Sequence, residues 1–228
     1  LPCSAGLLSA INLRATNKLL NEDGAVINGY SAVDDAVNTN GVIIDACDAF
    51  VQGGCNIEGM KTYHKMRIDE AILYTASVVI ASGGVMAEVF DGVIIGKREL
   101  LLPVESLAYE EKLGCSCWIH NHRVLVGNRQ MLVNHSISVP TEAEEKKHAG
   151  KAFAYYVVVE GETIATFLVD YKVIGSLRKI SPAFNKTGLV LILTSKEASL
   201  TEKVVSSKLA IEMAAVKILS SKGTDIMA

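Results

Sequence analysis

An acidic side chain, Asp45, ends a continuous apolar run that starts at Gly41. Such a run is typical of a buried parallel strand, and the residue at its C-terminal end points into a site at the edge of the sheet. A carboxylate in that place can serve as a nucleophile or as a ligand for a hard metal ion. Asp45 is therefore the first candidate for chemistry in this chain.

Thiols and imidazoles gather in a second segment, residues 115–122. Two cysteines and two histidines are the ligand types of a zinc site. Strand geometry argues against such a site, because Cys115 and Cys117 share one face of a strand, while His120 and His122 have the opposite parity and fall in the following turn. A metal site here requires a strongly bulged hairpin, and the simpler interpretation is two buried cysteines beside a polar turn.

The elements that position these residues follow from hydrophobic periodicity. The patterns predict helices over 7–20, 67–81, 85–95 and 174–185, and strands over 41–45, 115–119, 123–126, 153–159, 163–169 and 188–194. The order is α/β, then an insert of helices and hairpins, then α/β again. It predicts a parallel-sheet domain interrupted by an antiparallel α+β domain.

Four segments carry local signals of their own. The Gly- and Cys-rich stretch 46–60 is predicted to be a loop, and the chain beyond 194 is predicted to be mostly helical. Ser31 is expected to cap a short helix over 33–37. A capping box, Thr-x-x-Glu, opens a charged helix at Thr141 that ends near Gly150.

Composition excludes one class of function. The formal charge of the 228 residues is −3 and the basic residues are scattered, so we expect no nucleic-acid partner. The odd number of cysteines, five, predicts free thiols in a reducing compartment. The uncharged opening run 1–11 is shorter than the ~20 apolar residues of a membrane span, so it is either the stub of a membrane helix or the start of a buried one; its length favours the second.

Six short segments, taken in chain order, share the motif order of one family: Leu1-Pro2-Cys3, Gly24 to Gly29, Ile44 to Phe50, Val124 to Arg129, Leu168 to Asp170, and Leu193 to Lys196. The chain resembles a P-type cation-transporting ATPase of the heavy-metal branch, from its fourth membrane helix into its phosphorylation domain. The first segment is similar to the family's Cys-Pro-Cys without its first cysteine, and the second to its G-I-L-I-K-G strand. The third stands at its Asp-Lys-Thr-Gly-Thr signature, the fourth is close to V-L-V-G-N of its nucleotide-binding domain, and the last falls at its T-G-D motif.

The resemblance implies a fold class and a domain division. It implies an α/β fold in which a Rossmann-like, haloacid-dehalogenase-type phosphorylation domain is interrupted by an α+β, antiparallel-sheet, nucleotide-binding-type domain. The expected divisions are 1–58 for a membrane-helix stub and the first part of the phosphorylation domain, 59–169 for the nucleotide-binding-like domain, and 170–228 for the rest. The implied partners are membrane helices of the same polypeptide and a nucleotide, and the implied location is the cytoplasmic face of a membrane. The resemblance therefore favours the stub of a membrane helix for the opening run 1–11, in place of the start of a buried helix.

The resemblance also assigns chemistry to named residues. Asp45 is expected to attack the γ-phosphate of ATP and to bind Mg²⁺, and Thr194 to bond a phosphate oxygen. Lys196 is a candidate for the positive charge that is lost where the signature lysine is replaced by Ala46. The signature glycine is replaced by Asp48, whose carboxylate repels an incoming phosphate. We therefore expect the reaction to be performed poorly or not at all.

The expected nucleotide site is altered as well. The family's Ser-x-His-Pro is replaced by residues 82–85, Ser-Gly-Gly-Val, which lack its imidazole. Gly114 is the one remaining glycine of Gly-x-Gly, and Gly127 and Asn128 are either nucleotide contacts or an ordinary strand-to-helix turn. We expect weak ATP binding or none.

Two alternative functions stay open. The first is a non-catalytic sensor or scaffold that keeps the fold, and the second is a metal-binding module that uses the cysteines and histidines of 115–122. A soluble phosphatase of the same superfamily is the least favoured alternative, because it needs a second acid two residues after the nucleophile and that position is Cys47.

Overall fold

The computed structural model describes residues 3–141, 152–197 and 199–220. Its contacts divide the chain into two units, Leu1–Gly41 and Val42–Ala228. The predicted helix over 141–150 lies almost entirely outside the described residues.

The first unit contains α1 (Cys3–Leu20), the 3₁₀ turn η1 (Asn21–Asp23) and α2 (Tyr30–Val37). The side chain of Asn17 ties the segment after α1 back to the helix, because its Oδ1 accepts from the Ile27 amide at 2.7 Å and its Nδ2 donates to the Ile27 carbonyl at 2.9 Å. The prediction that Ser31 caps α2 is wrong, since the N-cap is Gly29, with a φ of 95° that favours glycine. Among the described helices, none is both long enough and apolar enough to cross a membrane.

The second unit begins with a three-stranded sheet. Its strands are β1 (Gly41–Asp45), β8 (Val190–Ser195) and β9 (Val216–Ser220), in the order β1-β8-β9. β8 and β9 are parallel, and the crossover between them runs through α9 (Glu202–Leu209) and the 3₁₀ turn η3 (Met213–Ala215). The strand predicted at 41–45 is confirmed, but the expectation that it is buried is wrong, because β1 is an edge strand and none of its residues is buried. The prediction of a mostly helical region beyond residue 194 is wrong for β9. This segment forms a strand because it pairs with β8, a contact that the local sequence pattern does not reveal.

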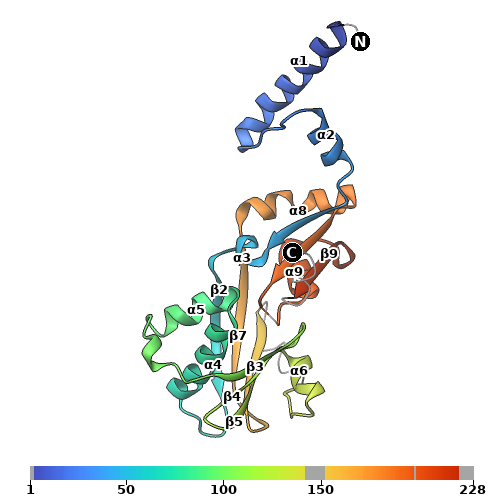
Figure 1. Cartoon of the computed structure of the whole chain (residues 1–228). Helices are drawn as coiled ribbons and strands as arrows, with labels where there is room; N and C mark the ends of the chain where they lie inside the picture. Colours follow the sequence, from blue (N-terminus) through green and yellow to red (C-terminus); the bar gives the residue numbers. More distant parts are fainter. Residues whose placement is uncertain (1–2, 142–151, 198, 221–228) are drawn as a thin grey trace. The chain divides into compact units, whose positions relative to one another are not determined.

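The second unit also contains a six-stranded antiparallel sheet of order β2-β7-β6-β5-β4-β3 (Figure 1). The bounds are β2 (Phe50–Thr62), β3 (Glu105–Glu110), β4 (Gly114–Ile119), β5 (His122–Gly127), β6 (Phe153–Val159) and β7 (Glu162–Val173). The β6–β7 hairpin turns on two residues, Glu160 and Gly161, both with positive φ, as in the tight turns that match strand twist. Both predicted hairpins are confirmed.

The loop prediction for 46–60 is wrong. This stretch forms α3 (Ala46–Ala49) and then β2, which pairs with β7 from Phe50↔Val173 to Thr62↔Ala165. Its glycines indicate a loop locally, but β7 supplies main-chain hydrogen bonds along its length. β2 and β7 both extend beyond the predicted boundaries at 58/59 and 169/170, so the division into domains stays a prediction.

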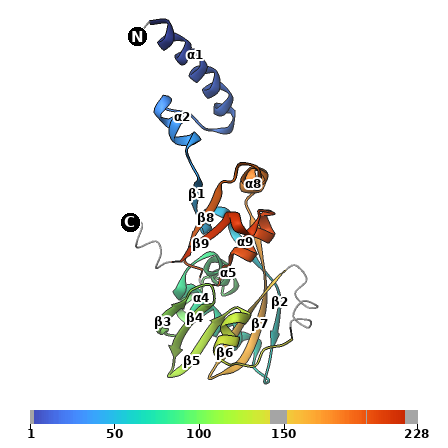
Figure 2. The ribbon, with the colours of Figure 1, turned by 90° about the vertical axis from the view of Figure 1, so that its right-hand side faces the viewer.

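The sheet is covered on both faces. Alternate residues of β5 and β6 face two clusters: Val124 and Val157 join the main core with α4 (Ile68–Ser82) and α5 (Val85–Val93), while Leu125 and Val158 join a second cluster with α6 (Arg129–Asn134) (Figure 2). The helices predicted over 67–81 and 85–95 are confirmed as α4 and α5, and the 3₁₀ turn η2 (Arg98–Leu100) follows them. The helix predicted over 174–185 is α8 (Gly175–Thr187).

Candidate functional site

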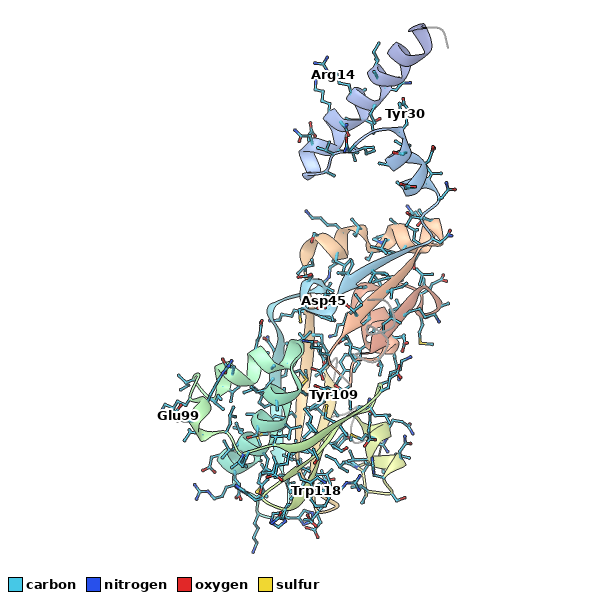
Figure 3. All side chains as sticks on the ribbon, in the orientation of Figure 1. Arg14, Tyr30, Asp45, Glu99, Tyr109 and Trp118 are labelled. Carbon is cyan, nitrogen blue, oxygen red and sulfur yellow. The ribbon has the colours of Figure 1, made fainter. Side chains whose placement is uncertain are left out.

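Asp45 lies at the C-terminal end of β1 and caps the helix that follows. Its Oδ1 accepts a hydrogen bond from the amide of Cys47 at 2.8 Å, which is the N-cap interaction of α3. The buried neighbours Ala46 and Ala49 anchor this short helix in the core, while the Asp45 carboxylate stays exposed. The sequence prediction of an accessible acid at a strand end is therefore confirmed (Figure 3).

Thr194 is brought to the same carboxylate from the adjacent strand. The hydroxyl Oγ1 of Thr194, on β8, donates to Oδ2 of Asp45 at 3.2 Å. Two residues far apart in the sequence thus meet where neighbouring strands of one sheet end. Each oxygen of the carboxylate accepts one hydrogen bond and keeps lone-pair capacity for a further partner.

Lys196 is not brought to Asp45. Its side chain is exposed and passes Gly83, where its Cδ lies 3.8 Å from the position of a Cβ built on the glycine. Among the ion pairs of the described residues, none involves Lys196 or Asp45. The hypothesis that Lys196 replaces the missing cation has no support in this arrangement.

The electrostatic surroundings of Asp45 are negative. Burial is the first cause of a raised pKa of the Cys47 thiol, and the charges of Asp45, Glu88 and Asp48 raise it further. Asp48 is exposed on the first turn of α3. An incoming phosphate therefore meets the carboxylates of Asp45 and Asp48, and neither of these two takes part in an ion pair among the described residues.

The described residues do not assemble a magnesium site around Asp45. No group of three or more His, Cys, Asp or Glu side chains within them is arranged to hold a metal ion. Mg²⁺ keeps several waters and needs only one or two carboxylates when a phosphate completes its shell, so Asp45 as a magnesium ligand stays a prediction.

The cysteines and histidines of 115–122 do not converge either. Cys115 and Cys117 are buried in β4, and burial raises the pKa of their thiols to about 12 and about 11. His120 lies in a two-residue turn and His122 begins β5, and both are exposed. Thiols that stay protonated are poor metal ligands, so the metal-binding module is not supported. Cys47, Cys55, Cys115 and Cys117 are free thiols, as predicted.

Gly114, Gly127 and Asn128 lie together at one end of the β4–β5 hairpin. Gly114 pairs with Gly127, and a Cβ on Gly114 would lie 2.3 Å from the carbonyl oxygen of Val126. Asn128 Oδ1 accepts from the amide of Met131 at 3.2 Å, which caps α6, and its Nδ2 donates to the carbonyl of Lys112 at 2.7 Å. Gly127 and Asn128 thus form a strand-to-helix turn, and the role of all three residues in nucleotide binding stays a prediction.

A hollow of about 460 Å³ opens in the six-stranded sheet region between β2 and α5. It is lined by Cys55, Asn56, Ile57, Glu58, Val89 and Val93. None of the predicted nucleotide residues lines it, since they belong to β4, β5 and the start of α6.

One buried acid, Glu197, was missed from the sequence. It follows β8 by two residues and is 5% exposed. Its neighbours Lys196 and Ser199 are polar, so hydrophobic periodicity gives no sign that this carboxyl is buried.

The comparisons with known proteins agree on one family. No protein-family model matches the chain. The chain is 28% identical over 142 residues to the cation-transporting ATPase HMA5 of Oryza sativa subsp. japonica, a match that covers 53% of this chain and 14% of that protein. It is 20% identical over 255 aligned positions to the copper-transporting ATPase RAN1 of Arabidopsis thaliana, covering 99% of this chain and 25% of that protein. The chain thus spans a quarter or less of these relatives.

Among solved structures, the catalytic domain of the CPx-ATPase CopB-B has a similar fold. The TM-score is 0.50 at 15% sequence identity, over 92% of this chain and 73% of that one. At this identity the likeness bears on the fold alone.

Proposed function

Because the homologues and structural neighbours of this chain are heavy-metal P-type ATPases, we propose that it is the cytoplasmic region of a P-type ATPase-like cation transporter. Asp45 stands at the position of aspartyl phosphorylation, and the reaction is impaired. One observation carries the proposal: Asp45 and Thr194, placed by the resemblance in two different family motifs, meet at 3.2 Å at the ends of adjacent strands.

The domain assignment is part of the proposal. The three-stranded sheet, with α8 and α9, is the haloacid-dehalogenase-type phosphorylation domain, formed from 1–58 and 170–228. The nucleotide-binding-type insert, 59–169, contains α4, α5 and α6 and most of the six-stranded sheet, whose strands β2 and β7 continue across its two boundaries. Membrane helices of the same polypeptide are the partner, and the chain lies on the cytoplasmic face. The antiparallel sheet and the parallel pair β8–β9 support this division.

The proposed chemistry is one displacement. An oxygen of Asp45 bonds to the γ-phosphorus of ATP, the bond to the bridging oxygen breaks, and ADP leaves with the electron pair. Thr194 orients the carboxylate by its hydrogen bond to Oδ2. The step needs positive charge against the transferred oxygens. Ala46 supplies none and Asp48 adds a negative charge, so we expect slow or absent transfer.

The test is the formation of an acyl phosphate. The full-length protein is incubated with γ-labelled ATP and Mg²⁺, quenched in acid and treated with hydroxylamine. We expect no label, or a trace that hydroxylamine removes. A strong, hydroxylamine-sensitive label that Asp45→Asn abolishes contradicts the impairment and keeps the family assignment.

A non-catalytic sensor or scaffold is the second candidate. It is favoured by Gly114, Gly127 and Asn128, whose packing and hydrogen bonds explain these residues without a nucleotide. Calorimetric titration with ATP, ADP and AMP-PNP separates the two. Micromolar affinity supports the enzyme, whereas absent heat at millimolar nucleotide supports the scaffold.

A further inference from the structure

The loop that follows β8 enters the six-stranded sheet region. Ser195, Glu197 and Ser199 are all less than a tenth exposed, although Lys196 between them is in solvent. The backbone of this loop lies close to the junction of α4 and α5, since a Cβ on Gly84 would lie 3.0 Å from the backbone nitrogen of Glu197. The loop therefore packs against Gly84, at a position where a larger residue would crowd the backbone of Glu197.

The carboxyl group of Glu197 is held mainly by hydroxyl groups. Its Oε1 accepts from Oγ of Ser199 at 2.8 Å and from the hydroxyl of Tyr155, on β6, at 3.4 Å. Oγ of Ser195 accepts from the backbone amide of Glu197 at 2.9 Å, which fixes the loop. Oε2 is buried without a hydrogen-bond partner among the described residues.

The groups that face this carboxyl come from most strands of the six-stranded sheet. Its charge contributes to raising the pKa of Cys55 on β2, Tyr109 on β3, Cys115 on β4, Tyr155 on β6 and Tyr171 on β7. None of these is a cation. Among the ion pairs of the described residues, none contains Glu197.

A carboxylate in such a place is unfavourable. Removing an ionised acid from water without a paired cation costs more than hydroxyl donors return. Burial accordingly raises the pKa of Glu197, and it outweighs the opposite effects of the Ser199 hydroxyl, the nearby backbone amides of Met86 and Ser199, and the Tyr155 hydroxyl. The neutral acid fits better, because it needs fewer hydrogen-bond donors than the carboxylate and places no charge among the surrounding thiol and phenol groups.

We propose that Glu197 is a proton-dependent latch, whose neutral carboxyl group holds the loop after β8 against α5 and the six-stranded sheet and whose ionisation releases that loop. The latch joins the strand that carries Thr194 to the other sheet of the unit. It rests on the packing of this loop and not on the proposed function, since no nucleotide or phosphate takes part.

The sign of the pH dependence follows from linkage. A carboxyl with a raised pKa in the folded protein binds its proton more tightly there than in the unfolded chain. Its contribution to stability is therefore lost as the pH rises from the ordinary glutamate range toward the folded pKa. Over that interval the unfolding equilibrium constant is expected to rise tenfold per pH unit from this group.

The experiment compares the full chain with Glu197→Gln and with a control, Glu212→Gln, whose side chain is exposed. Urea unfolding is measured from pH 5 to pH 9. We expect the glutamine variant to gain stability over the wild type as the pH rises, because the amide stays neutral, and the control to follow the wild type. Equal pH dependence of wild type and Glu197→Gln overturns the proposal.

A second measurement needs no variant to fold and separates a latch from a merely buried acid. Hydrogen exchange of the amides of Glu197 and Leu200, which donate hydrogen bonds to Oγ of Ser195 and to the carbonyl of Glu197, is followed against pH in the wild type and corrected for the intrinsic exchange rate. We expect protection to fall with rising pH in this segment and to hold in β6. Protection that is constant with pH overturns the latch, even if the infrared band of a protonated carboxyl is found.

Discussion

Both oxygens of the Asp45 carboxylate already accept a hydrogen bond within the protein, one from the Cys47 amide and one from Thr194. The residue is thus held in one orientation, as a nucleophile must be. No ion pair of Asp45 is found among the described residues, because Ala46 is buried and apolar and the Lys196 side chain lies beside Gly83. At the residue scale, the position and orientation of Asp45 fit phosphoryl transfer, whereas the charges around it do not.

Asn128 joins the β3–β4 turn to α6 through two hydrogen bonds. Asn128→Ala removes the cap of α6 and leaves the Lys112 carbonyl without its donor, so we expect the free energy of unfolding to fall by about 2 kcal/mol in urea titrations. Gln130→Ala, on the exposed face of the same helix, is the control and should change stability by less than about 0.5 kcal/mol. Equal effects of the two substitutions would show that the cap is not formed.

The elements divide into those with a local signal and those without. α4, α5 and the two hairpins could be predicted from periodicity and turn residues, because their partners lie next to them in the sequence. β2 could not, since its glycines indicate a loop and its partner β7 is distant. Glu197 could not either, because nothing in a polar loop reveals that tertiary packing will bury one of its acids.

Helix α5 is fastened to the sheet by an aromatic pair. The rings of Phe90 and Phe167, on β7, lie 5.4 Å apart at 76°, an edge-to-face arrangement, and Phe90 is fully buried. Phe90→Ala is expected to lower the free energy of unfolding by about 3–5 kcal/mol, because it leaves a cavity between helix and sheet. Val93→Ala, one turn away and partly exposed, should cost less than about 1 kcal/mol; a similar loss there would argue against a specific role for the ring pair.

At the scale of the second unit, polar side chains among the described residues join the two sheets at three places, beside the apolar core that the sheets share. Glu197 is one, the ion pair of Lys112 with Glu202 at 2.6 Å is another, and the pair of Lys208 with Asp170 is the third. Lys208 also lies over the ring of Phe153, 5.5 Å from its centre. Neither ion pair contains Glu197, so rising pH is expected to loosen the loop without separating the sheets.

The Lys112–Glu202 pair can be measured by a double-mutant cycle with Lys112→Met and Glu202→Gln. The Lys112 side chain is 42% exposed and that of Glu202 20%, so solvent screens the pair and we expect a coupling energy of about 0.5–1 kcal/mol that falls with added salt. The more exposed pair Arg67–Asp69 is the matched control, with coupling near zero. A coupling energy no larger than that of the control pair would show that the Lys112–Glu202 pair does not help to join the two sheets.

The central claim is that Asp45 keeps the place of a phosphorylated aspartate in surroundings that oppose the reaction. The most direct measurement is the amount of acid-stable, hydroxylamine-labile phosphate per mole of full-length protein after incubation with γ-labelled ATP and Mg²⁺, with Asp45→Asn as the control. The account predicts that wild type and control differ by a trace or not at all. A wild type that approaches one phosphate per chain, with none in Asp45→Asn, would contradict it.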